Sequence, residues 1–425
     1  MRIIALAKRS ILMVGAWDSA IVSLSGFLTN LLAGRFLVPV DYGLFITAFI
    51  VANMAMLIQA SFISSPYSIL APRMEAAGRR DYLAGSTWIT CCATIPVSFF
   101  LSAVMYFYFR KTLDGVGLAT ALAIFAFYVA TVMLQDFVRR VCFTHRREPA
   151  ALLLDIISAG GQVLFLVVMR SRMTLDMALI IVSGTTAMGI AAVYLVPLRN
   201  KSLPIRLQPI CFAARENVVL GKWLFVTAGV SWIANQIYIL AVAAFQTPIV
   251  VAQLGAARTI AAISNPAIMT VENVGTPRAS RVVHESGEPA LRRFIGKVTL
   301  VGCIPFMALG ALCFAYPDGL IRILFHRSFG EISTLVRIFS LMPFMWFATR
   351  SISVGINALK KPRALLPVYA IAACTTLTIG VCLARRYGAL GAAYGMLFNS
   401  IVLVTGFLIQ FVRLTRPRSS AVRAS

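Results

Sequence analysis

The chain has 425 residues, of which 59% are hydrophobic and only 13% are charged, and its mean hydropathy is +0.85. Soluble domains carry about 25% charged residues, so this composition excludes an ordinary soluble protein. A membrane-spanning helix needs roughly 20 apolar residues, so the length permits a dozen such helices joined by short loops. The apolar runs lack the alternation of a β-barrel, and the sequence therefore predicts an all-α polytopic membrane protein.

The net charge of +24 does not indicate a nucleic-acid partner, because the basic residues lie in clusters between apolar runs. The eight cysteines include no C-x-x-C pair, and the three histidines stand far apart. We expect no metal site, no cofactor and no enzymatic activity. The basic segment Met1–Ser10 and the long run that follows it predict a retained first span rather than a signal peptide.

Taken in chain order, the apolar runs predict about twelve spans. They lie near residues 11–34, 43–66, 85–109, 117–138, 149–169, 175–197, 221–245, 249–272, 293–317, 333–357, 364–384 and 388–412. The longest loops are expected at residues 198–220 and 273–292, both basic.

The lysines and arginines are distributed unequally over the two sides of the predicted membrane. One side, which includes both termini, carries 27 of them, the other side carries 9, and 3 lie inside spans. Basic residues are enriched in cytoplasmic loops, so we expect both termini in the cytoplasm and an even number of spans.

Matched segments indicate that a unit of six helices occurs twice. Pro39 and Pro248 lie 209 residues apart in short turns, and the segments Arg146–Leu154 and Lys360–Val368 match at an offset of 214. Repeats of this kind are common in transporters, whose substrate site lies between them. The predicted parts are therefore an N-terminal lobe (1–198), a basic linker (199–220), a C-terminal lobe (221–413) and a basic tail (414–425).

Arg258 is the first candidate for a binding residue, because a charge in the bilayer interior costs at least about 2.5 kcal/mol and needs a reason. Asn265 lies seven residues later on the same helical face. A guanidinium here is suited to a phosphate or pyrophosphate, which it binds through two parallel hydrogen bonds. A structural ion pair, for example with Asp18, is the alternative.

Further polar residues fall inside the predicted spans. Asp18 is a candidate for proton or sodium binding or for pairing with an arginine, whereas Asp155 is expected to reach water from its position near a loop. Asn30, Asn235 and Gln236 are candidates for hydrogen bonds to sugars, although packing between helices explains them equally well. Arg350 is a weaker cavity candidate, because it and Arg337 lie near span ends, where arginine reaches the headgroups.

Four segments together resemble the polysaccharide flippases of the MOP superfamily, which are related to the MATE exporters. They are Leu31–Phe45 with its pattern Pro39, Tyr42, Gly43, then Gln253–Ile260, Pro277–Arg281 and Tyr387–Gly395. The resemblance extends over nearly the whole chain. It implies two lobes that open alternately to each side of a bacterial inner membrane around a cationic cavity, lined by spans 1, 2, 7 and 8.

The resemblance further implies that the substrate is an undecaprenyl-phosphate- or pyrophosphate-linked oligosaccharide, a precursor of O-antigen or exopolysaccharide. Membrane lipids, a glycan polymerase and export machinery are the implied partners. A MATE-like cation exporter is the nearest alternative, but it favours an acidic cavity, and the chain has only 15 carboxylates. A membrane-embedded glycan-assembly enzyme or a scaffold is the third alternative, although no loop here is long enough for a separate domain.

Overall fold

The computed structural model describes residues 21–110, 112–113, 115–195, 207–326 and 332–416, and every regular element in these ranges is helical. The first half contains a helix Ile21–Phe36. It is followed by α2 (Pro39–Gln59), η1 (Ala60–Ser64), α3 (Ser65–Leu70), η2 (Ala71–Arg73), α4 (Ala76–Phe109), α5 (Gly115–Thr144), α6 (Glu148–Val168), η3 (Arg170–Arg172) and α7 (Leu175–Leu195).

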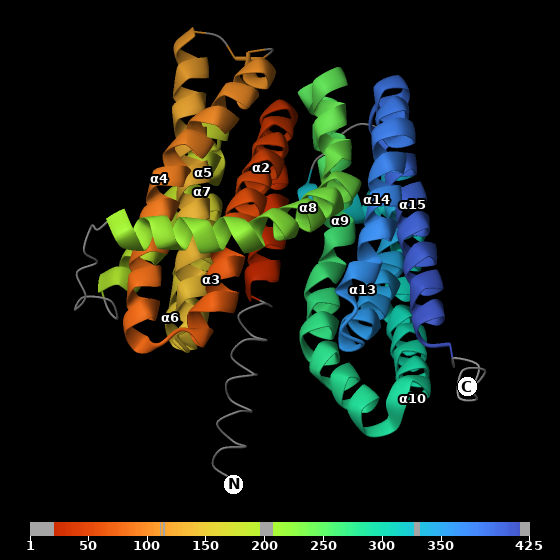
Figure 1. Ribbon diagram of the computed structural model, residues 1–425. Coiled ribbons are helices and arrows are strands. Elements are labelled where there is room, and N and C mark those ends of the chain that lie inside the picture. The colour runs from red at the N-terminus through yellow and green to blue at the C-terminus, as the bar shows by residue number, and fades with distance from the viewer. Residues whose placement is uncertain (1–20, 111, 114, 196–206, 327–331, 417–425) are drawn as a thin grey trace, which may run out of the picture.

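The second half repeats this sequence of helices with more interruptions. It contains α8 (Leu207–Phe245), α9 (Pro248–Ala261), η4 (Ala262–Ser264), α10 (Asn265–Ala315), α11 (Pro317–Phe325), α12 (Ser333–Ser340), α13 (Met342–Ala358), η5 (Pro362–Leu365), α14 (Leu366–Thr375), η6 (Thr376–Gly380) and α15 (Val381–Leu414). Figure 1 shows the two halves side by side, the first in red to yellow and the second in green to blue.

Among the described residues, eight helices are long and apolar enough to cross a membrane. Two of them count as more than one span, because the backbone reverses inside α10 at Gly287 and inside α15 at Gly388, both with positive φ. The helix Ile21–Phe36 and the pair α12–α13 are shorter pieces of further passes, whereas α9 continues through η4 into the first arm of α10 as one pass. The expected fold class of about twelve helices in two lobes is confirmed.

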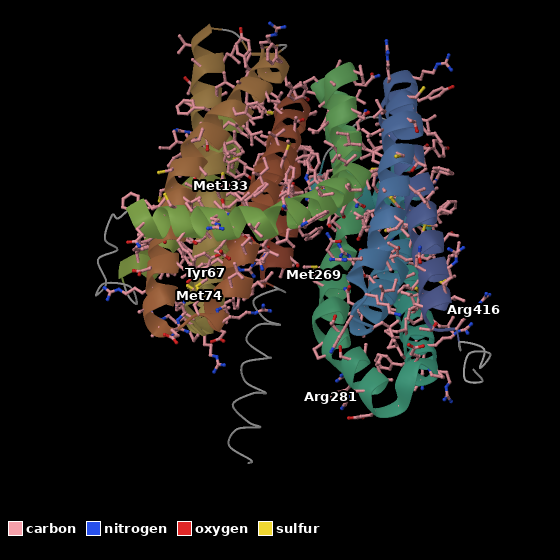
Figure 2. The ribbon with its side chains drawn as sticks, in the orientation of Figure 1. Tyr67, Met74, Met133, Met269, Arg281 and Arg416 are labelled. Atoms are coloured by element: carbon pink, nitrogen blue, oxygen red, sulfur yellow. The ribbon has the colours of Figure 1, made fainter. Side chains whose placement is uncertain are left out.

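The two ends of the molecule differ in charge. Figure 2 shows Met74, Arg281 and Arg416 at the same end, which we call the basic end. The segment from Pro39 to Arg73 runs from the opposite end, the Pro39 end, to the basic end. At 34 residues, α4 is about 51 Å long, whereas the hydrocarbon is about 30 Å thick. The long helices therefore extend beyond the apolar layer, which explains the charged first turns of α4.

The matched segments near Arg146 and Lys360 form the same helix cap. Both residues have φ of 57°. In the first, the backbone N–H of Arg147 donates to Cys142 O, and in the second that of Lys361 donates to Ile356 O. Each cap is a Schellman-type turn that satisfies the last carbonyls of its helix. All these positions differ by 214, so the repeat seen in the sequence extends to individual backbone hydrogen bonds.

The helix α8 joins the two halves. Figure 1 shows it crossing the helices of the first half rather than running parallel to them. The first turns of α8 lie close to the first half at two glycines. A Cβ on Gly85 of α4 would lie 2.3 Å from Pro209 O of α8, and a Cβ on Gly221 of α8 would lie 2.9 Å from Ser61 O of η1. In the same contact, Tyr82 donates a hydrogen bond to Asn217.

The later turns of α8 belong to the second half, where Tyr238 donates to Gly395 O and Asn399 donates to Ala234 O. The prediction of two long loops was thus largely wrong, because residues 207–220 are helical and residues 273–292 form two helical arms around Gly287. Both segments extend apolar spans, and the length of the spans was underestimated.

The halves meet most closely at the Pro39 end. The helices α2 and α9 both begin with a proline at the first helical position, where its missing N–H costs nothing. They approach so closely that a Cβ on Gly43 would lie 1.9 Å from Pro248 O. Farther along, Tyr42 and Thr259 are hydrogen-bonded through their hydroxyls at 3.3 Å. The position of Gly43 therefore requires glycine because of space rather than backbone conformation.

This contact gives a test of the fold. Gly43→Ala forces α2 and α9 apart, and overpacking of this kind costs about 1–3 kcal/mol. We expect a lower unfolding temperature in detergent, measured by the intrinsic fluorescence of the purified protein. Gly160→Ala is the matched control, since nothing lies within 4 Å of a Cβ there. Equal unfolding temperatures for the two variants would contradict the packing.

Candidate functional site

Arg258 lies in the last turn of α9. Ten residues separate it from Pro248, or about 15 Å along the helix, which places it near the middle of a 30 Å hydrocarbon layer. The α-helix ends just beyond it, with a 3-10 turn at Ala262–Ser264 before Pro266 at the start of α10. Proline lacks the N–H that would continue the helical ladder, and the positive side chain lies where the helix dipole is negative.

The Arg258 side chain is half-buried. Its Nη1 atom is buried and has no hydrogen-bond partner among the described residues. A buried polar group without a partner costs about 1–3 kcal/mol, and more when it is charged. Such a cost at mid-depth of a span is typical of a residue whose partner is a ligand.

The surroundings of Arg258 place it at the boundary between the halves. Its neighbour Thr259 contacts Tyr42 of α2. On its own helical face, Asn265 is exposed and Met269 is 39% exposed. Figure 2 shows Met269 on the second half at the edge that faces the first. The face is thus half-buried at Arg258 and becomes exposed toward the basic end.

The three predicted amide residues behave differently from one another. Asn30 and Asn235 each donate to the carbonyl four residues earlier in their own helix, Gly26 O and Ser231 O, at 2.7 Å. Each bond uses one of the two amide hydrogens within the residue's own helix. The buried Oε1 of Gln236, in contrast, has no partner among the described residues.

Trp232 was not predicted and lies one turn before Gln236 on α8. Its buried Nε1 also has no partner among the described residues. The helices α8 and α9 are in contact. Among the described residues, these two helices carry four buried polar atoms without hydrogen-bond partners: Trp232 Nε1, Gln236 Oε1, Arg258 Nη1 and, near the start of α8, Asn217 Nδ2. The sequence signal that could have pointed to Trp232 is its position four residues before an intramembrane glutamine.

The other predicted cavity residues are not brought to Arg258 by any described contact. Arg350 on α13 is exposed and makes contacts of its own. Arg337 on α12 is exposed, as expected of an arginine near a span end. Asp18 lies outside the described residues, so its pairing with Arg258 stays a prediction.

Asp155 was expected to reach water, and this was wrong. Its side chain is 2% exposed, and Arg139 Nε lies 2.8 Å from its Oδ2. Nearby, Asp136 accepts a hydrogen bond from Ser64 and pairs with Arg140. These acids and bases neutralise one another within α5 and α6 and at the junction with η1, which indicates a structural role. The predicted spans put Asp155 in the fifth span and Arg139 in the loop after the fourth, and they gave no sign of the contact between the two side chains.

No family model and no curated protein matches this sequence. Solved structures do match. An inward-facing multidrug resistance MATE family transporter of the MOP superfamily has 12% identity and a TM-score of 0.75, with 92% of this chain and 94% of that one covered. The lipid II flippase MurJ, in an inward closed conformation, has 12% identity and a TM-score of 0.69, with 98% and 90% covered.

A third match is a MOP superfamily transporter from Pyrococcus furiosus, described as having a binding pocket of reverse polarity. It has 13% identity and a TM-score of 0.66, with 95% of each chain covered. At these identities the likeness concerns the fold. The protein is a multi-span membrane protein with the fold of the MOP superfamily transporters.

Proposed function

We propose that this protein moves a lipid-linked oligosaccharide across the bacterial inner membrane by alternating access between its two halves. The observation that carries the proposal is the guanidinium of Arg258, which lies at mid-depth and whose buried Nη1 has no hydrogen-bond partner among the described residues. Arginine stays charged and matches phosphate oxygens with two donors, so an anionic headgroup is the ligand it suits best.

The closed Pro39 end and the open face toward the basic end support the proposal. A phosphate and its glycan cannot cross hydrocarbon unaided, because desolvation of charge and hydroxyl groups is expensive. Polar groups on α8 and α9 replace that hydration, while the apolar tail stays in lipid. Separation of α2 from α9, together with closure at the basic end, then exposes the site to the other side.

A substitution at Arg258 tests the site. Removal of a charge-assisted hydrogen bond costs about 1.5–3 kcal/mol, so Arg258→Gln should lower glycan export at least about tenfold with protein abundance unchanged. Arg258→Lys keeps the charge but not the planar fork, and we expect intermediate export. The assay is surface glycan in cells that carry each variant in place of the natural gene.

Arg337→Gln is the matched control, because Arg337 is an exposed arginine of the same half. It should export normally. Normal surface glycan with Arg258→Gln would remove the basis of the proposal.

Deletion of the gene distinguishes the proposal from its rivals. Loss of surface glycan with accumulation of the lipid-linked intermediate on the cytoplasmic leaflet supports the flippase. The MATE-like exporter, which the likeness to a MATE family transporter favours, predicts intact glycan and greater sensitivity to cationic compounds. Loss of glycan without the intermediate indicates an enzyme or scaffold that acts earlier.

The orientation is also testable. The excess of basic residues predicts that the basic end faces the cytoplasm. Alkaline phosphatase fused after Thr112, near the Pro39 end, should be active, whereas fusion after His145 should be inactive. The opposite pattern would reverse the direction of transport that we propose.

A further inference from the structure

A contact between the two halves at the Pro39 end involves an arginine and a histidine. Arg35 lies in the last turn of the helix Ile21–Phe36, and His326 directly follows α11. Arg35 Nη2 and His326 Nε2 are 2.8 Å apart, although 291 residues separate them in the chain. The contact is open to solvent, so it is accessible to protons.

The backbone around His326 holds its ring in place. Phe325 is fully buried against Gly34, where a Cβ would lie 2.6 Å from its ring. His326 itself has a left-handed backbone, with φ of 54°, and its N–H donates to Arg322 O to end the helix. Because the cap and the buried phenylalanine fix this turn, the imidazole stays directed at Arg35 while the halves are in contact.

The chemistry of the contact depends on the protonation of the histidine. A guanidinium only donates hydrogen bonds, so Nε2 accepts one here only as a neutral imidazole. A protonated ring carries N–H groups on both nitrogens and has no acceptor. Protonation would therefore replace a hydrogen bond with two cations at contact distance.

Among the described residues, no carboxylate forms an ion pair with His326. On α11, Arg322 lies one turn earlier, and Asp318 at the opposite end accepts a hydrogen bond from Ser333. The neighbouring α12 carries the exposed Arg337. On α2, Asp41 accepts the N–H of Leu175. The last 15 residues of α10 carry no charge, and the helix Ile21–Phe36 carries only Arg35.

We propose that His326 and Arg35 form a proton-sensitive latch: the neutral histidine keeps the Pro39 end closed, and a proton taken up from the solution on that side releases it. This inference rests on the proposed alternating opening of the two halves. Histidine is the side-chain type whose charge commonly changes near neutral pH, which is the property that such a latch requires. The latch adds to the contact of α2 with α9, which does not titrate in this range.

Distances between spin labels test the latch without any substrate. Labels at Val116 and Tyr316, which are 84% and 67% exposed, report on opposite halves at the Pro39 end once the eight native cysteines have been replaced. Repulsion between two charges in contact in water corresponds to about a fivefold change in an equilibrium. From pH 8 to pH 5.5, we expect the ratio of open to closed populations to rise about fivefold.

His326→Asn is the decisive variant, because asparagine tolerates the left-handed backbone and its side-chain oxygen accepts from Arg35 without titrating. Its distance distribution should not depend on pH. Arg35→Gln, which removes the second cation, should likewise lose most of the response.

A wild-type protein without a pH response, or His326→Asn with the wild-type response, would overturn the latch. Normal glycan in cells that lack the gene, together with a pH response that His326→Asn abolishes, would instead refute the proposed substrate and leave the latch intact.

Discussion

The contact of α2 with α9 is the constraint on which the arrangement of the two halves depends. The two helices meet backbone to backbone at Gly43 and Pro248, and farther along α9 the side chain of Ile46 packs against Gly255. The prolines that begin the two helices fix where each one starts. The closure of the Pro39 end thus comes from one stretch of close packing, and Arg258 lies at the far end of that stretch on α9.

The position of Arg258 links this packing to chemistry. In hydrocarbon, backbone groups must be hydrogen-bonded within helices, and side-chain charges are tolerated only where they have a function or pair with an opposite charge. Asp155 and Asp136 each pair with a neighbouring arginine. No described carboxylate pairs with Arg258, which lies on the element that contacts the other half. Binding of an anion there would change the free energy needed to separate the two halves. Such a change is the requirement for coupling a ligand to a conformational change.

Much of the fold could be predicted from the sequence, because long apolar runs and basic clusters report directly on the membrane. The matched prolines and the matched segments at Arg146 and Lys360 predicted the duplication, and the structure adds that both segments share one cap. The extent of the helices could not be predicted, since charged turns at the ends of α4, α8 and α10 resemble loops in composition. A hydropathy pattern shows where a helix is in lipid and not where it ends.

The candidate site was less predictable than the fold. Arg258 was identifiable because a charge inside an apolar run is rare. Contacts across the halves, such as Arg35 with His326, depend on which turns meet in space, and the sequence separation of 291 residues contains no information on that. For the same reason the burial of Asp155 was missed, while the local bonds of Asn30 and Asn235 lie within one helix and follow from spacing.

The single helix α8 has a consequence for how the protein is assembled. The first turns of α8 pack against Gly85, and Gly221 of α8 packs against Ser61. Part of the helix that begins the second half therefore completes the surface of the first half. During synthesis the first half emerges with a groove that only the next segment of the chain can fill. Filling it sets the direction in which the rest of α8 leaves, before the helices of the second half have been made. The second half is then built onto an axis that the first half has already aligned.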